Sequence, residues 1–136
     1  MCRLMYAIAC LTVVGAAVGC GDDGTEADRI GVGAQCTDDG QCESADEQIT
    51  LVCLTEFTGG YCGLEGCTGD VDCPQGSACV TNDNGTNYCY LVCTEGGKEE
   101  CNRNRSVENE SNCSANIEFV DEHLEGKACV PPSSGD

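Results

Sequence analysis

The sequence predicts a small disulfide-rich fold that is irregular, contains short β-hairpins and has no large hydrophobic core. Cysteine supplies 15 of the 136 residues, and in a short exported chain such an excess indicates a disulfide scaffold. Tryptophan is absent, and only five aromatic residues lie beyond the N-terminal segment, too few to fill one large core. We therefore expect covalent links to supply much of the order in the chain.

Residues 1–19 have the features of a secretory signal peptide. Arg3 carries the only charge, and the apolar run from Leu4 to Val18 is 15 residues long. A comfortable membrane span needs about 20 apolar residues, so this run is too short. Small residues end the segment, as they do before a cleavage site.

The stretch around Cys20 indicates a lipid anchor. The residues Ala17-Val18-Gly19-Cys20 resemble the lipobox of bacterial lipoproteins, with Ala17 where that family usually has leucine. The resemblance implies that Cys20 receives diacylglycerol and that the signal is cut just before it. Two or more acyl chains anchor a protein stably, whereas a single chain does not. The alternative is ordinary signal cleavage that leaves Cys20 as a free or paired thiol.

The cysteine count agrees with lipidation of Cys20. Cys2 and Cys10 lie in the segment to be removed, and 12 cysteines from Cys36 to Cys129 can pair completely. Cys20 is then left over, and an odd thiol in an exported protein needs a special explanation. Residues 20–35, which begin with this cysteine, are rich in glycine and acidic residues and predict a flexible acidic tether.

The rest of the chain is organised as a repeat. Residues 36–42 and 67–73 share the form Cys-Thr-x-Asp-x-x-Cys, and each is followed by a cysteine between two hydrophobic residues and then by Tyr-Cys. We expect three cysteine-rich repeats of four cysteines, at 36–62, 63–89 and, more loosely, 93–129, followed by a tail at 130–136. The expected disulfide cysteines are Cys36, Cys42, Cys53, Cys62, Cys67, Cys73, Cys79, Cys89, Cys93, Cys101, Cys113 and Cys129.

The second repeat resembles the Dickkopf N-terminal cysteine-rich type. That family's run is Cys-x-x-Asp-x-Asp-Cys-x-x-Gly-x-x-Cys followed by a further cysteine, and it matches Cys67, Asp70, Asp72, Cys73, Gly76, Cys79 and Cys89. The resemblance covers 67–89 well and 36–62 partly, because the first repeat has a long insert between Cys42 and Cys53. It implies a type of fold, and the Wnt-antagonist activity of that animal family is not carried over.

Local patterns predict one hairpin in the second repeat. Val80-Thr81, a turn at 82–85 and a strand from Thr86 to Tyr90 form a strand–turn–strand pattern, and the Asn-Gly step favours the positive φ of tight turns. Residues 116–124 predict either a short strand or one helical turn. Four cysteines allow three pairings in each repeat, and we favour the crossed pairing of first with third and second with fourth. Breaking one bridge, as in Cys73→Ala, should then loosen 67–89 and leave 36–62 protected.

The charge of the chain excludes whole classes of partner. The net charge is −18, from 24 acidic and 6 basic residues. A nucleic-acid-binding protein must neutralise phosphates with Lys and Arg, and docking on anionic lipid needs a basic patch. The sequence therefore predicts no nucleic-acid partner, and membrane contact only through the N-terminal lipid.

Metal binding and catalysis are weakly indicated. Structural zinc sites usually contain Cys-x-x-Cys, which this chain lacks, and the acidic pairs do not have EF-hand spacing. His123 is the only histidine and stands in a charged stretch, for which we expect an exposed surface position. No nucleophile motif accompanies it. We therefore expect no metal, no cofactor and no enzymatic activity.

The function expected from the sequence is that of an exported lipoprotein anchored to the cell envelope. It would display disulfide-stapled repeats as a binding or structural module for an unidentified protein or glycan partner. The alternative is a soluble secreted cysteine-rich ligand or inhibitor.

Overall fold

The computed structural model describes residues 27, 30–42, 49–94, 97–123 and 126–133 of the chain. It is a small, irregular β fold held by six disulfides, as the sequence predicts. So many disulfides are typical of an extracellular or exported protein, because intracellular compartments keep thiols reduced. The predicted signal peptide and Cys20 lie outside the described residues.

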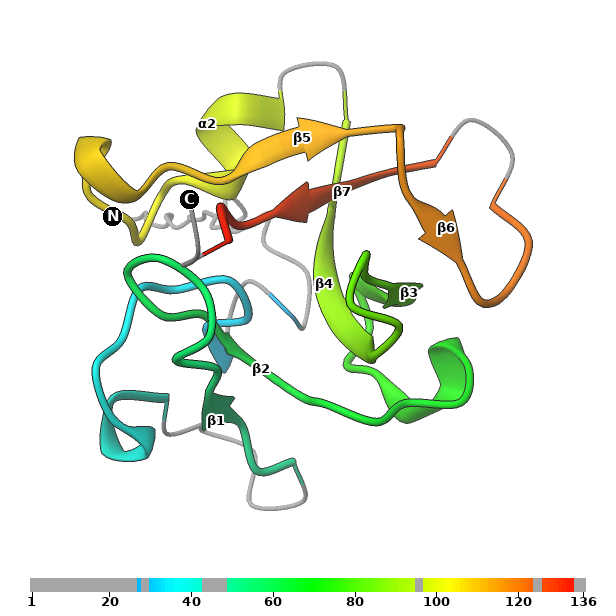
Figure 1. Cartoon of the computed structure of the whole chain (residues 1–136), viewed down its shortest axis with the longest axis horizontal. Helices are drawn as coiled ribbons and strands as arrows, with labels where there is room; N and C mark the ends of the chain where they lie inside the picture. Colours follow the sequence, from blue (N-terminus) through cyan, green and yellow to red (C-terminus); the bar gives the residue numbers. More distant parts are fainter. Residues whose placement is uncertain (1–26, 28–29, 43–48, 95–96, 124–125, 134–136) are drawn as a thin grey trace, which may run out of the picture.

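Within the described ranges, seven short strands form two antiparallel sheets (Figure 1). Strands β1 (Val52–Cys53) and β2 (Cys62–Gly63) pair in the first repeat. The second sheet has the order β5-β7-β4-β3-β6. Its strands are β3 (Ser77–Thr81), β4 (Asn87–Cys93), β5 (Asn112–Ser114), β6 (Glu118–Phe119) and β7 (Lys127–Val130). This sheet joins the second and third repeats in one structure.

The hairpin predicted in the second repeat is present. Strands β3 and β4 pair in antiparallel register, with Cys79 opposite Cys89. The Gly85 N–H donates to the Asn82 carbonyl at 2.8 Å, and Gly85 has a φ of +83°, which a residue without a Cβ adopts at no steric cost. In the 116–124 segment, the strand of our two alternatives is correct, because β6 pairs with β3 through Phe119 and Val80.

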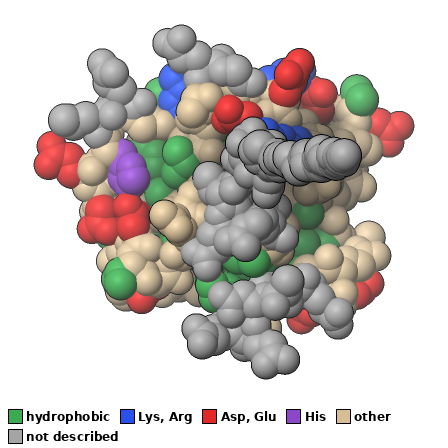
Figure 2. Space-filling view, turned by 180° about the vertical axis from the view of Figure 1, so that it is seen from behind, with side chains coloured by type: hydrophobic (Ala, Val, Ile, Leu, Met, Phe, Trp, Pro, Cys, Tyr) green, Lys and Arg blue, Asp and Glu red, His purple; other side chains and the backbone are tan. Residues whose placement is uncertain are grey.

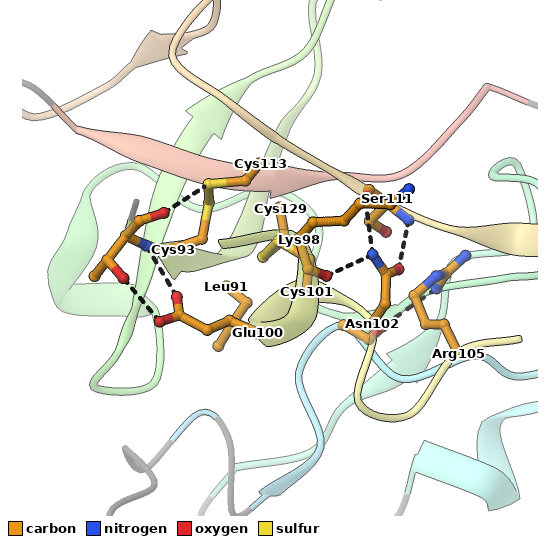
Figure 3. Close-up of a disulfide and its surroundings, with 12 residues drawn as sticks. Leu91, Cys93, Lys98, Glu100, Cys101, Asn102, Arg105, Ser111, Cys113 and Cys129 are labelled. Atoms are coloured by element: carbon orange, nitrogen blue, oxygen red, sulfur yellow. Dashed lines mark hydrogen bonds between the residues drawn. A yellow bond between two sulfur atoms is a disulfide. The ribbon is translucent and has the colours of Figure 1, made fainter. Parts of the chain in front are cut away.

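The helices among the described residues are single turns. Those that lie wholly within the described ranges are the 3₁₀ turns η2 (Asp39–Cys42), η3 (Asp70–Asp72) and η4 (Val107–Asn109) and the α-helix α2 (Gly97–Cys101), and Ala27 and Ile30 are also helical. In the third repeat the Asn102 amide donates to the carbonyls of Lys98 and Ser111 and so ties α2 to the start of β5 (Figure 3). No helix in the described ranges is long and apolar enough to cross a membrane.

Each repeat has the crossed disulfide pairing that we favoured from the sequence. The bonds join Cys36 to Cys53, Cys42 to Cys62, Cys67 to Cys79, Cys73 to Cys89, Cys93 to Cys113, and Cys101 to Cys129. The loops that they close are 12 to 28 residues long in sequence separation. A loop of about 15 residues is worth about 3 kcal/mol in the chain-entropy model.

The repeats share one cluster of buried side chains and are not separate bodies. Phe57 and Tyr61 of the first repeat pack edge-on against Tyr88 and Tyr90 of the second, with ring centroids 5.2 to 6.0 Å apart. The Tyr61 hydroxyl donates to the Cys129 carbonyl of the third repeat at 3.2 Å. Sequence patterns within single repeats do not reveal this packing, because its members come from all three.

The expected flexible tether at 20–35 is wrong for the residues that the structure describes. Ala27, Ile30 and Val32 are buried in the shared cluster, with 0%, 6% and 4% of their surface exposed. The Ala27 N–H donates to the Gln75 carbonyl at 2.7 Å. In residues 30–34 apolar side chains alternate with glycine, and these apolar side chains pack into the core. The high glycine content makes this pattern hard to recognise in the sequence. Residues 20–26 and 28–29 lie outside the described ranges.

The segment expected as a tail at 130–136 begins inside the fold. Val130 belongs to β7 and pairs with Asn112 of β5. The Thr58 N–H donates to the Pro132 carbonyl at 2.8 Å, so residues up to Ser133 close over the first repeat. Residues 134–136 are not among those described.

Candidate binding groove

The predicted disulfide cysteines all lie in disulfides, and their sulfurs gather at three points. In each repeat three of the four sulfurs lie within 4.8 Å of one another: those of Cys36, Cys42 and Cys53, of Cys67, Cys73 and Cys89, and of Cys93, Cys101 and Cys129. The thiolate is the form of cysteine that binds metal, and a sulfur in a disulfide has no thiolate to offer. The disulfides in these clusters therefore serve to link the chain segments within each repeat.

A groove of about 650 Å³ lies on the five-stranded sheet. Its lining comes from the β3–β4 hairpin, from β5 and the β5–β6 connection, and from Val130 of β7. Strands β5 and β6 are consecutive in the chain but lie at opposite edges of the sheet, so their connection must cross from one edge to the other (Figure 1). This crossing places residues 114–118 opposite the hairpin and creates the hollow between them.

The floor of the groove is apolar and its rim is polar. Val80 is fully buried, and Ile117 and Val130 are partly buried. Around them stand the amides of Asn82, Asn112 and Asn116 and the carboxylates of Asp83 and Glu118. None of the described residues that line the groove is basic. An apolar floor with a few convergent polar groups is the usual form of a small-molecule site, for which 300–1,000 Å³ is typical.

Tyr90 lines the groove and carries a hydroxyl without a partner. The side chain is 0% exposed, and no hydrogen bond to its hydroxyl oxygen forms within the described part of the chain. Burial raises the pKa of this phenol well above its ordinary value, and the nearby Tyr61, Tyr88, Glu56 and Asp83 add to the rise. The hydroxyl is therefore neutral and retains an unused O–H donor and acceptor. An unmet buried polar group of this kind costs about 1–3 kcal/mol.

The neighbouring Tyr61 is equally buried but fully satisfied. Its hydroxyl donates to the Cys129 carbonyl at 3.2 Å and accepts the Leu91 N–H at 3.0 Å. The guanidinium carbon of Arg105 lies 5.8 Å from the centre of its ring. The contrast between the two tyrosines shows that the core can satisfy a buried phenol, as it also does for Tyr88, whose hydroxyl bonds to Glu56 and Asn84.

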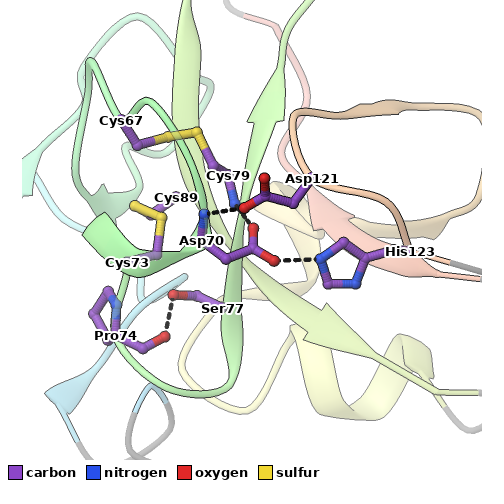
Figure 4. Close-up of polar contacts among 9 residues, drawn as sticks. All are labelled: Cys67, Asp70, Cys73, Pro74, Ser77, Cys79, Cys89, Asp121 and His123. Carbon is purple, nitrogen blue, oxygen red and sulfur yellow. Dashed lines mark hydrogen bonds and ion pairs between the residues drawn. A yellow bond between two sulfur atoms is a disulfide. The ribbon is translucent and has the colours of Figure 1, made fainter.

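His123 is partly buried and paired, so the expectation of an exposed surface histidine is wrong. Its side chain is 29% exposed and its Nε2 lies 2.5 Å from Asp70 Oδ2 (Figure 4). The same Asp70 accepts the Cys79 N–H, and the Asp70 N–H donates to Asp121. Ser77, whose hydroxyl is drawn in the same view, donates to the Pro74 carbonyl at 2.6 Å. The cluster thus fastens η3 to the third repeat, and it has no nucleophile in contact with the imidazole among the described residues.

On the face drawn in Figure 2, acidic side chains lie mostly toward the margin of the molecule. The lining contains two carboxylates out of the 24 acidic residues of the chain. Most of the net charge therefore keeps the protein soluble and repels other anions.

Reasoning from the sequence missed the groove. Its residues come from segments about 30 residues apart, and only the topology of the sheet brings them together. The signal in the sequence is the richness in asparagine of residues 82–87 and 112–116.

Comparison of the chain with models of protein families, with curated proteins and with solved structures finds no match. The groove is therefore interpreted from its own chemistry.

Proposed function

We propose that the chain is an exported lipoprotein, anchored to the cell envelope through a diacylglycerol-modified Cys20, whose disulfide-bonded body is a non-enzymatic binding module. The observation that carries the proposal is the complete pairing of the twelve cysteines from Cys36 to Cys129. This pairing leaves Cys20 without a disulfide partner among the described cysteines, and lipidation accounts for such a residue.

The position of Ala27 adds a geometric consequence. Ala27 is buried in the body, so only seven residue steps separate the lipidated cysteine from the fold. A fully extended chain spans at most about 3.3–3.6 Å per residue, so the body lies within about 25 Å of the anchor. The module would thus work close to the membrane surface rather than at the end of a long stalk.

The binding role is supported by the groove, which has the size and the mixed polarity of a small-molecule site. The non-enzymatic role is supported by the contacts of His123, which fasten two parts of the fold together. Three small crossed-disulfide repeats that share a core form a rigid support for such a site.

The intact mass of the protein from its native host tests the anchor. Thiols are alkylated before reduction, so that only cysteines free in the native protein gain the label. We expect the mass of residues 20–136 plus acyl chains, with no label. An unmodified Cys20 would contradict the lipid anchor and favour the alternative of a soluble secreted ligand. Several labelled cysteines would contradict the disulfide framework. The control is Cys20→Ser, which should abolish acylation and leave all six disulfides intact.

A further inference from the structure

Tyr90 and Tyr61 form a matched pair that points to a ligand. Their ring centroids lie 5.3 Å apart and both side chains are fully buried, yet only the Tyr61 hydroxyl has partners. Buried polar groups in folded proteins are nearly always hydrogen-bonded, and an exception calls for an explanation. Tyr90 differs from Tyr61 in lining the groove, although its hydroxyl is enclosed. A molecule that enters the groove and displaces the side chains over this hydroxyl would supply the missing partner.

The rim of the groove carries further polar groups without partners. The side-chain amides of Asn82, Asn112 and Asn116 make no hydrogen bond to another described residue, and neither do the carboxylates of Asp83 and Glu118. Each amide offers two donors and an acceptor, and each carboxylate offers acceptors. The groove thus presents both kinds of group around one apolar floor.

The chemistry of this set excludes an anionic ligand. Two carboxylates and no basic side chain line the groove, in a protein whose net charge is −18. A phosphate, a sulfate or an acidic sugar would be repelled, because like charges without a compensating cation raise the free energy of the complex.

A cationic ligand is also a poor fit. An ammonium group only donates hydrogen bonds, so it would use the carboxylates and leave the amide N–H groups of Asn82, Asn112 and Asn116 unpaired. A hydroxyl donates and accepts at once and can therefore pair with amide, carboxylate and phenol alike. A ring that bears several hydroxyls, with apolar C–H groups on its face, also covers the floor made by Val80, Ile117 and Val130.

We infer that this groove binds a neutral saccharide, with the Tyr90 hydroxyl at its base hydrogen-bonding one sugar hydroxyl and the amides of Asn112 and Asn116 binding others at the rim. The inference rests on the proposed function of the body as a binding module and gives that module a ligand class. The groove has room for a sugar of one to a few rings, since its 650 Å³ falls within the range of small-ligand sites.

The test uses the full exported chain in detergent micelles, with ¹H–¹⁵N chemical shifts as the readout. The probes are the neutral disaccharides maltose, cellobiose, mannobiose and N,N′-diacetylchitobiose, with sialyllactose as the anion and putrescine as the cation. We expect at least one neutral disaccharide to shift the amides of 80–85 and 112–118 with a dissociation constant near the millimolar range, and neither charged probe to do so. Absence of binding by all four neutral probes, or binding of putrescine instead, would overturn the inference.

Two variants connect the binding to the proposed groups. Tyr90→Phe removes a hydroxyl that has no partner, so the fold should be as stable as the parent or more so, while affinity falls about tenfold. Asn112→Ala alters an exposed rim residue and should also weaken binding about tenfold without changing the thermal midpoint. Asn104→Ala, an exposed asparagine outside this groove, is the matched control and should change neither. If the parent, Tyr90→Phe and Asn112→Ala bind the sugar with equal affinity, the sugar does not bind in this groove.

Failure of the sugar inference and failure of the anchor are separable. A lipidated Cys20 with no saccharide binding would leave the anchored module standing and reject only its ligand. Saccharide binding by a protein with unmodified Cys20 would reject the anchor and keep the groove.

Discussion

His123 Nε2 lies 2.5 Å from Asp70 Oδ2, a contact that joins the third repeat to the first turn of the second. Asp70 makes two further bonds there, since its Oδ1 accepts the Cys79 N–H at 2.9 Å and its own N–H donates to Asp121 at 2.7 Å. The imidazole also packs on Phe119, with ring centroids 4.5 Å apart. The His123 side chain therefore contacts both a carboxylate of η3 and a residue of β6, and so connects the two repeats.

Replacing His123 with alanine should loosen this junction. The variant loses the contact to Asp70 and the ring contact to Phe119, and it leaves the Asp70 carboxylate with the Cys79 N–H as its hydrogen-bond donor. Because both partners are about 30% exposed, we expect the free energy of unfolding to fall by only about 1 kcal/mol. Urea unfolding measures the loss, and amide exchange should quicken at Cys79. Glu122→Ala, at the exposed neighbouring position, is the control; an equal loss in that variant would show that the pair contributes nothing specific.

Arg105 should contribute more, because it fastens the third repeat to the first through backbone carbonyls. Its guanidinium donates to the carbonyls of Thr58 at 3.0 Å, Gly60 at 2.7 Å and Gly33 at 3.2 Å, and its Nε donates to Asn109 at 2.6 Å. Lysine cannot reproduce this fork. We expect Arg105→Lys to lower the free energy of unfolding by about 2–3 kcal/mol.

Lys98→Ala provides the contrast for Arg105. Lys98 pairs with Glu110 at 2.6 Å, but its side chain is 68% exposed. A pair of this kind is worth at most about 1 kcal/mol, so the variant should unfold close to the parent in the same denaturant series. Equal losses in the two variants would mean that the Arg105 hydrogen bonds do not hold in solution.

Breaking the Cys73–Cys89 bond should destabilise more than the second repeat. Considered as separate units, the repeats predict that Cys73→Ala loosens 67–89 and leaves 36–62 protected. The packing of Tyr61 against Tyr90 predicts instead that protection also falls in 53–62, because the shared cluster loses its support on one side. Hydrogen exchange resolved by residue measures this, with Cys73 and Cys89 both replaced to avoid a free thiol. Full protection of 53–62 in that variant would restore the independent units.

The sequence predicted the features that depend on short spacing. The fold class followed from the cysteine count and the β3–β4 hairpin from the turn at 82–85. Four cysteines in each repeat allow three pairings, of which the crossed one that we favoured is present. Each of these is set by residues within about 30 positions of one another. The composition of the segment led to the wrong expectation for Ile30 and Val32. A segment rich in glycine and acidic residues can still supply buried side chains to a neighbouring sheet.

The groove and the contacts between repeats could not be predicted in the same way. They depend on the strand order β5-β7-β4-β3-β6, in which the third repeat lies on both sides of the second. The sequence around Glu118 and Phe119 does not indicate which strand these residues pair with. His123 and Asp70 are 53 residues apart, and only this topology brings the only histidine of the chain to a carboxylate of η3.

The buried tyrosines predict a loss of stability at alkaline pH. Burial raises the pKa of Tyr61 and of Tyr90 far above the ordinary value of about 10, although the Leu91 N–H and Arg105 partly oppose the rise at Tyr61. In the unfolded chain both phenols ionise near pH 10, while in the folded protein they stay protonated. The folded state therefore binds more protons above pH 10, and stability that is complete below that pH is lost as the pH rises. Each tyrosine contributes a slope of about 1.4 kcal/mol per pH unit, or about 3 kcal/mol for the pair.

Urea unfolding between about pH 9 and pH 12 measures this slope, with the absorbance of tyrosinate followed in parallel. We expect a constant free energy of unfolding up to pH 10, a steep decline beyond it, and tyrosinate absorbance from Tyr61 and Tyr90 that appears only as the fold is lost. Hydroxide also attacks disulfides, so each sample is returned to pH 7 as a control. Recovery of the native signal there shows that the disulfides have survived. Tyr61→Phe should halve the dependence of the free energy of unfolding on pH, because only the Tyr90 phenol then contributes. Ionisation of both tyrosines near pH 10 in a protein that remains folded would contradict their burial, and with it the enclosed Tyr90 hydroxyl that the groove requires.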